Sequence, residues 1–298
     1  MSGKYDGVPR AVPIQGRKGN LKLWAEMDGD YLGWDSVSMR YGLVDGCGMI
    51  PEETEKQHVH DYDQMIWFLS ADPDDMLNLG AEVETDLGPE NIRHRRCAPH
   101  AVVIPAGLPH FSPVVREVER PFFYVSISLT PKLAAAAADP EAEAGSGEWS
   151  RFRGTYDDRV IGLTFNVHEP FHYDSKWKQP TGGVTCFLGS ETSHFPATVA
   201  WSTIRQDTHT GPRRDDGKHH PHAHADFDEA LILLSQDTDN LTDLHCTAEF
   251  CVGEEGVDQQ MFPLTRATFM PMKKGMYHLP LTFRDVKGAC VFITVGLH

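Results

Sequence analysis

Closely spaced histidines and acids fill the segment "HHPHAHADFDEALILL" from His219 to Leu234, which then turns apolar. In a β-strand, residues i and i+2 point to the same face, so His222 and His224 would direct two imidazoles to one point. Glu229, placed after the turn "ADFD", would return on a neighbouring strand and face the same point. His278, at the end of "PMKKGMYH", would add a third imidazole from far along the chain. This pattern predicts a metal site.

The donor set of this site indicates which ions it would bind. Three neutral imidazoles and one carboxylate suit Mn, Fe, Co, Ni, Cu or Zn, whereas Mg and Ca prefer ligands that are all oxygen. The competing interpretation of the segment is a solvated, histidine-rich loop. His219 and His220 fit that second interpretation, because the corresponding places in the repeat described next hold Lys56 and Gln57.

The chain carries this motif twice. The stretch "KQHVHDYDQMIWFLS" (Lys56 to Ser70) aligns with "HPHAHADFDEALILLS" (His220 to Ser235). Further along, "VVIPAGLPH" aligns with "TFMPMKKGMYH", and the offset between the copies drifts by only a few residues. A tandem duplication is the simplest account of two such matches in the same order.

The first copy departs from the second in one donor. His58, His60 and His110 match the three histidines, but Gln64 stands where the acid would be. A neutral amide is a weaker ligand than a carboxylate. The residues leave two possibilities open: a metal site of three histidines, with Gln64 as a fourth ligand or as a supporting group, or a site that has lost its metal.

Short β-branched and aromatic runs such as "AVVIP", "FFYVSISL", "ALILLS" and "CVFITVGL" recur along the chain, separated by turn-forming residues. Long amphipathic helical patterns are almost absent, so the sequence predicts an all-β sandwich or barrel. The stretch "TPKLAAAAADPEAEAGSGEWS" has the composition of a linker. We therefore expect one domain over residues 1–130, a linker over 131–150 and a second domain over 151–298.

Composition excludes several classes of partner. The formal net charge of -16 disfavours a nucleic-acid or anionic-membrane surface, since either would need a basic patch. No run of about 18 apolar residues and no secretory pattern at the start is present, so we expect a cytoplasmic protein. The six cysteines form no CxxC pair and are expected to be reduced.

The spacing His222-x-His224-x(4)-Glu229, followed far along by His278 in a Pro-x(3)-Gly-x(2)-His setting, resembles the two-part metal motif of the cupin superfamily. The duplication makes the chain resemble a bicupin over nearly its whole length. That resemblance implies two tandem jelly-roll β-barrels. It also implies His222, His224, Glu229 and His278 as the ligands of a divalent transition metal, with His58, His60, Gln64 and His110 as the less complete set.

An octahedral ion held by four protein ligands keeps two positions open, which fits substrates with two adjacent or 1,3-related oxygens. A bound metal would polarise a carbonyl or activate water, and Glu229 would serve as a base. The resemblance favours a metal-dependent enzyme that cleaves a C–C bond in a small oxygenated cyclic, dicarbonyl or phenolic compound. Ring-opening dioxygenation with iron is the first hypothesis, and hydrolytic opening of a cyclic 1,3-dicarbonyl with manganese or zinc is the second.

A third hypothesis is a non-catalytic binding or storage bicupin, for which the substitution of Gln64 is the strongest argument. Jelly-roll edge strands often pair between subunits, so we also expect a homodimer. Tyr62 and Phe227, which follow the two His-x-His pairs, are expected in the core or in a pocket wall.

Overall fold

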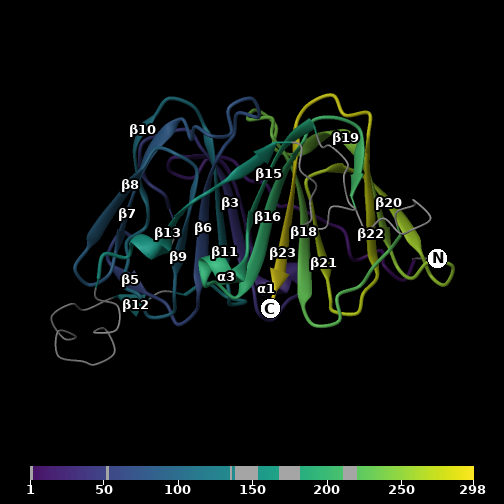
Figure 1. Ribbon diagram of the computed structural model, residues 1–298, viewed down its shortest axis with the longest axis horizontal. Coiled ribbons are helices and arrows are strands. Elements are labelled where there is room, and N and C mark those ends of the chain that lie inside the picture. The colour runs from purple at the N-terminus through teal and green to yellow at the C-terminus, as the bar shows by residue number, and fades with distance from the viewer. Residues whose placement is uncertain (1–2, 52–53, 135, 138–153, 168–181, 211–219) are drawn as a thin grey trace. The chain divides into compact units, whose positions relative to one another are not determined.

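The computed structural model describes residues 3–51, 54–134, 136–137, 154–167, 182–210 and 220–298 (Figure 1). Within these residues the chain consists of antiparallel strands, and helical structure is limited to α1 (Gly29–Leu32), α3 (Ser190–Ser193) and the 3-10 turn η2 (Asp157–Arg159). The all-β class predicted from the short apolar runs is confirmed. None of these helices is long and apolar enough to cross a membrane.

Two compact units make up the chain. The N-terminal unit comprises Pro13–Leu163 and Ser193–Phe195. The C-terminal unit comprises Met1–Val12, Thr164–Thr192 and Pro196–His298.

Besides Ser193–Phe195, two short segments that form strands lie on the other side of the division expected at residues 130 and 151. Strand β1 (Arg10–Ala11) pairs with β21 (Thr268–Met272) of the C-terminal unit. Strand β13 (Val160–Gly162) pairs with β9 (His100–Ile104) of the N-terminal unit. Each segment covers a sheet edge that would otherwise expose unpaired backbone groups, and this is the physical reason for the difference.

Most of the linker expected over residues 131–150 lies outside the described residues. Its described part includes β12 (Ala136–Ala137), which pairs with β5 (His58–Val59). The start of the expected linker thus forms a short strand beside the first His-x-His pair.

Besides the short β12-β5 pair, the described part of the N-terminal unit has two sheets, and both supply residues to one buried core. The larger has the order β13-β9-β6-β11-β3-β2, with β6 (Gln64–Ser70), β11 (Phe122–Ser128), β3 (Ser38–Val44) and β2 (Leu21–Met27). The smaller has the order β4-β10-β7-β8, with β4 (Gly48–Met49), β10 (Val114–Val118), β7 (Ala81–Leu87) and β8 (Ile92–Arg96).

The described part of the C-terminal unit repeats this plan around a second core. Its larger sheet has the order β1-β21-β18-β23-β16-β15-β14, with β18 (Asp228–Ser235), β23 (Cys290–Leu297), β16 (Ala197–Ile204), β15 (Gly182–Leu188) and β14 (Phe165–Val167). The smaller has the order β17-β22-β19-β20, with β17 (Thr208–Thr210), β22 (His278–Arg284), β19 (Asp243–Val252) and β20 (Gln260–Arg266).

Strands β6 and β18 hold corresponding central positions in the two larger sheets. Every residue of β6 is buried, and so is every residue of β18 after Asp228, which explains the uninterrupted apolar runs that follow Gln64 and Glu229. Ile66 and Leu231 lie in the two cores, and strand alternation places the residue two positions earlier on the same inner face. Gln64 and Glu229 therefore project into the interior of their units.

Candidate metal centre

The C-terminal histidines meet where two segments are joined by backbone hydrogen bonds. His222 and His278 pair through reciprocal N–H···O bonds of 3.0 and 2.8 Å. The ligand nitrogens of His222, His224 and His278 all lie within 4.8 Å of one another. The fold thus brings together three imidazoles that are distant in sequence.

Glu229 lies among these imidazoles. Its Oε2 atom is 2.9 Å from Nε2 of His278 and 3.3 Å from Nε2 of His224. Nδ1 of His278 lies 2.9 Å from the carbonyl oxygen of Met276 and donates its hydrogen there. A neutral imidazole has one N–H, so Nε2 would face the carboxylate with a lone pair. Such a contact between two acceptors requires a cation, and the residues therefore fit a metal ion or a second proton.

The charge state of Glu229 also fits a cation. Burial alone would raise its pKa, but the His224 and His278 rings beside it outweigh that effect and lower the pKa from 4.5 to about 2. The carboxylate is therefore ionised at neutral pH. An ionised carboxylate beside three imidazoles is a suitable donor set for a divalent transition metal.

The N-terminal set has the same backbone arrangement. His58 and His110 pair through N–H···O bonds of 2.9 and 3.0 Å. The ring centroids of His58 and His110 are 4.2 Å apart, and those of His60 and His110 are 4.8 Å apart. Gln64 completes the group, with its Oε1 atom 3.2 Å from Nε2 of His60. All four side chains are buried.

Backbone carbonyls fix the orientation of these N-terminal rings. The Nδ1 atoms of His58, His60 and His110 lie 2.8 to 3.0 Å from the carbonyl oxygens of Lys56, Tyr62 and Leu108. Each ring that donates from Nδ1 keeps a lone pair on Nε2, the form that binds metals. Nε2 of His110 is buried without a hydrogen-bond partner, and burial holds the pKa of this ring well below 6.5. The N-terminal set fits a metal in its nitrogen donors and lacks the carboxylate.

Matching turns place the third histidine in both units. Gly107 and Gly275 have the same backbone φ of +79°, a left-handed conformation that favours glycine. Each donates its N–H to a carbonyl of the second histidine, at 2.8 Å to His60 and 2.7 Å to His224. The Pro- and Gly-containing segments before His110 and His278 therefore form the same type of turn.

An aromatic ring covers the second histidine of each pair. Tyr62 stacks on His60 with ring centroids 4.1 Å apart, and Phe227 stacks on His224 at 4.3 Å. These contacts place both aromatic rings against candidate ligands, as expected for a pocket wall.

The expectation for His220 is wrong. It is buried, and its Nδ1 atom lies 2.6 Å from Oε2 of Glu255 in the turn between β19 and β20. Its counterpart Gln57 donates to the carbonyl oxygen of Gly88 and to Oδ1 of Asn91, in the turn between β7 and β8. Both residues fasten the His-x-His segment to the smaller sheet, which the identity of the side chain alone does not reveal. His219 lies outside the described residues.

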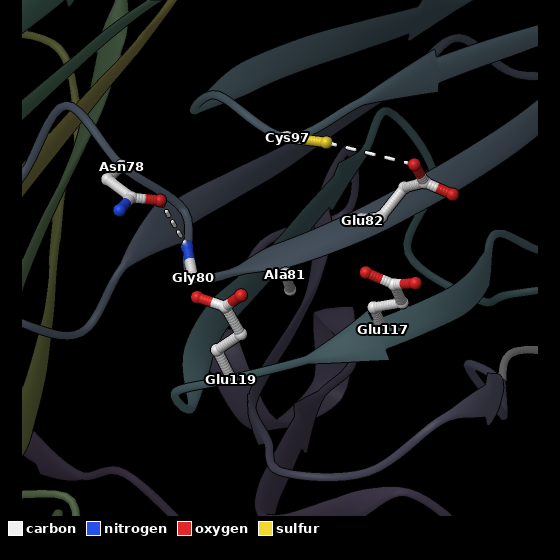
Figure 2. A pocket seen from close by; sticks show the side chains of 7 residues that line it. All are labelled: Asn78, Gly80, Ala81, Glu82, Cys97, Glu117 and Glu119. Carbon is white, nitrogen blue, oxygen red and sulfur yellow. Dashed lines mark hydrogen bonds between the residues drawn. The ribbon is translucent and has the colours of Figure 1, made fainter.

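A hollow of about 130 Å³ lies elsewhere in the N-terminal unit, beside the start of β7 and the end of β10 (Figure 2). It contains none of the candidate ligands; its lining is Asn78, Gly80, Ala81, Glu82, Cys97, Glu117 and Glu119. Burial and the charges of Glu82 and Glu117 raise the pKa of the Cys97 thiol, which keeps it protonated. Its three carboxylates and unreactive thiol give this hollow no evident role.

Sequence reasoning missed a group of buried polar residues close to Gln64. Ser38 and Arg40 lie on β3, and Ser126 and Ser128 lie on β11. The sequence offered one indication of this group, a single arginine within the otherwise uncharged strand "SMRYGLV". Whether that arginine points to the inner face can be decided only when the pairing register of the strand is known.

No protein-family model matches this sequence, and no curated protein matches it either. Solved structures do match in fold. A variant of the oxalate decarboxylase of Bacillus subtilis has a TM-score of 0.61 at 10% identity, with 100% of this chain and 78% of that chain covered. The same enzyme studied for its Mn(II) centers has a TM-score of 0.59 at 10% identity, with the same coverage.

Two further solved structures are also similar to this chain in fold. The formate complex of the oxalate decarboxylase of Lactobacillus farciminis has a TM-score of 0.59 at 10% identity and covers 98% of this chain and 86% of that one. AerE from Microcystis aeruginosa has a TM-score of 0.53 at 10% identity and covers 98% and 97%. The expected fold of two tandem jelly-roll barrels is confirmed.

Proposed function

We propose that this chain is a metal-dependent enzyme that cleaves a C–C bond in a small, oxygen-bearing substrate, with its reactive centre in the C-terminal unit. The observation that carries the proposal is the convergence of His222, His224 and His278 within 4.8 Å, with Oε2 of Glu229 against two of the rings. These four residues would hold a divalent transition metal. When bound, the ion supplies Lewis-acid chemistry and open positions for substrate oxygens.

Glu229 has the second chemical role. Its carboxylate is buried inside the barrel, and once released from the metal it would accept a proton from a substrate hydroxyl or from an acidic C–H. The rings of His224 and Phe227 stack beside it and form one wall, which would orient a planar substrate. The carboxylate therefore serves as a ligand at rest and as a base during turnover.

The interior next to Glu229 favours a cyclic substrate. Adjacent strands place Leu231, Thr294, Ala200 and Phe187 in register across the larger sheet. A mainly apolar row with a small residue at its centre suits a ring better than a fully charged compound. Ring opening by dioxygen on bound iron is the reaction that we propose first.

Two further reactions are candidates and can be tested in the same experiment. Hydrolytic opening of a cyclic 1,3-dicarbonyl would use the same ligands with manganese or zinc and water. The likeness to oxalate decarboxylases, one of them studied for Mn(II) centers, supports manganese and adds decarboxylation, which also cleaves a C–C bond. We retain a binding or storage protein as the non-enzymatic alternative.

Oxygen dependence separates these reactions. Protein loaded with iron or manganese is incubated with catechol, cyclohexane-1,3-dione and oxalate, in air and without oxygen, and substrate loss and oxygen consumption are followed. We expect loss of a cyclic substrate in air that requires oxygen and is abolished in Glu229→Gln. Loss that persists without oxygen would replace the first reaction by hydrolysis or decarboxylation. A fully loaded protein that converts none of these substrates would favour binding.

A further inference from the structure

Polar side chains form two adjacent rows inside the N-terminal unit. Strands β6, β11, β3 and β2 lie side by side in that order. In the first row, Gln64 is opposite Ser128, which is opposite Ser38. In the second row, Ile66 is opposite Ser126, followed by Arg40 and then Glu26. Directly opposed residues of antiparallel strands share a face, so each row lies on one side of the sheet.

That side is the interior. Ile66 belongs to the buried core, and its row partners therefore point inward as well. Nε2 of Gln64 lies 2.9 Å from Oγ of Ser126, and Oε1 of Gln64 lies 3.2 Å from Nε2 of His60. The polar rows are thus continuous with the N-terminal histidines.

The second row contains a buried cation. Arg40 is only 8% exposed, and its Nε donates to Oε2 of Glu26 at 3.2 Å. A guanidinium has five N–H donors arranged to match a carboxylate. Buried charge of this kind is costly unless anionic or strongly accepting groups surround it.

The first row contains hydroxyls that lack partners. Ser38 and Ser128 are 0% and 1% exposed, and neither Oγ atom has a hydrogen-bond partner. Buried polar groups in folded proteins are almost always hydrogen-bonded, so two orphaned hydroxyls on adjacent strands mark a place for a polar ligand or water.

The C-terminal unit does not share this polarity. Alignment of Gln64 with Glu229 places Ala200 where the N-terminal unit has Arg40, and Phe187 where it has Glu26. In the other row, Gly296 takes the place of Ser128. In these rows of the described residues, the Arg40–Glu26 pair thus has no counterpart in the C-terminal unit, and the two barrels present different interiors to a ligand.

We propose that the N-terminal unit binds a small carboxylate beside His60 and Gln64, held by the Arg40 guanidinium and by the hydroxyls of Ser38 and Ser128. A carboxylate fits this place because the guanidinium fork matches its two oxygens and each hydroxyl can donate one further hydrogen bond. A phosphate is bulkier and tetrahedral, so it fits less well than a planar carboxylate beside the buried hydroxyls of Ser38 and Ser128. This site is independent of the reaction proposed for the C-terminal unit.

Binding of simple carboxylates tests the proposal without any knowledge of a reaction. The full chain is treated with a chelator and titrated calorimetrically with acetate, with oxalate, with inorganic phosphate and with acetamide, the neutral analogue of acetate. We expect acetate or oxalate to bind at least about tenfold more tightly than acetamide or phosphate, because ionic hydrogen bonds to the guanidinium require the carboxylate. Equal binding of acetate and acetamide, stronger binding of phosphate, or no binding of either carboxylate would overturn the proposal.

Serine variants locate the site. Ser38→Ala and Ser128→Ala remove hydroxyls that have no partner in the protein, so the unfolding temperature of the free chain should stay the same or rise. Carboxylate affinity should nevertheless fall by about tenfold in each variant. Thr198→Ala, at the position in the C-terminal unit that corresponds to Ser38, is the matched control and should bind carboxylates like wild type.

Arg40→Gln completes the set and should abolish carboxylate binding. If this variant does not fold, the serine variants decide the question alone. Serine variants that unfold more easily but bind acetate as wild type does would show that the hydroxyls serve the fold through buried water, and would reject the ligand site.

Discussion

Glu229 and Gln64 occupy the same place in their two units and differ in charge. Each lies near Nε2 of the second histidine, at 3.3 Å for Glu229 with His224 and 3.2 Å for Gln64 with His60. The carboxylate brings a negative charge to three imidazoles, whereas the amide brings only a dipole. A dication should therefore bind more tightly in the C-terminal unit.

Exchanging the two side chains tests this difference. We expect Glu229→Gln to lower metal affinity of the C-terminal site by about tenfold or more, because one anionic ligand is lost. Gln64→Glu should raise the metal content of the N-terminal site by supplying the missing carboxylate. The measurement is metal per chain by elemental analysis after dialysis against a fixed free-metal concentration. Equal metal content in wild type and both variants would show that neither residue is a ligand.

At the scale of single residues, the sequence predicted those side chains whose role follows from local alternation. His-x-His places two rings on one side of a short extended segment, so the pairs at His58 and His222 could be found without coordinates. The ion pair of His220 with Glu255 and the inward direction of Arg40 were missed, because both depend on which strands become neighbours.

Strands β7, β8 and β10 carry an ionic cluster on the sheet face that points away from the core. Glu84, only 2% exposed, accepts hydrogen bonds from Arg95 and, at 2.5 Å, from Arg116, and Arg93 lies 3.7 Å away. Burial alone would raise its pKa, but the hydrogen bonds from Arg116 and Arg95 and the charge of Arg93 lower the pKa below 4.5. This carboxylate links the three strands.

The cluster gives the N-terminal unit a pH-dependent stability. A carboxyl whose pKa is lower in the folded than in the unfolded chain stabilises the fold fully above about pH 4.5 and progressively less as pH falls through the folded pKa. Glu84→Gln should therefore reduce the free energy of unfolding by about 1–3 kcal/mol at pH 7 and by less at pH 3. Urea denaturation at both pH values measures this. A loss that is equal at the two pH values would show that packing, not charge, is responsible.

Glu82→Gln is the matched control for this experiment. Glu82 lies on the same face of β7, is more exposed, and is 3.4 Å from Nε of Arg95. Its loss should be smaller at every pH, because a solvated ion pair contributes about 1 kcal/mol or less.

At the scale of elements, apolar runs predicted strands such as β6, β11, β18 and β23, since each is buried on both faces. The sequence did not indicate that β1 and β13 would pair across the expected domain boundaries. Both are very short, and their pairing depends on open sheet edges that exist only after the barrels form.

The chain as a whole contains a duplication, and a short segment from each half of the sequence belongs to the other unit. The first residues belong to the C-terminal unit: Val12 donates its N–H to the carbonyl oxygen of Ala267 at 2.9 Å, and the hydroxyl of Tyr5 donates to Asp258 at 2.8 Å. Tyr5 and Val8 also pack against the C-terminal core. The C-terminal unit is thus incomplete without a segment from the far end of the sequence.

Deletion of residues 1–11 should therefore destabilise the C-terminal unit. We expect a loss of about 1–3 kcal/mol in its unfolding free energy, because the edge of β21 and part of the core become exposed. Differential scanning calorimetry of the full and shortened chains provides the measurement, with Asp258→Asn as a milder control that removes only the anchor. Identical unfolding of the shortened chain would contradict the role of the segment.

The duplication also explains why we propose different roles for the two barrels. The two barrels keep the same backbone pairing at their histidines, while their interiors have diverged to an apolar row beside Glu229 and a charged row beside Gln64. One barrel would then carry the reaction and the other would bind a carboxylate.

The central claim is that His222, His224, Glu229 and His278 together hold one transition-metal ion. Anomalous scattering from a crystal of protein purified without added metal, recorded on both sides of the manganese, iron and zinc edges, tests it most directly. We expect an anomalous peak bonded to all three imidazoles and to the Glu229 carboxylate. A C-terminal unit without such a peak, or a peak only at His58, His60 and His110, would contradict it.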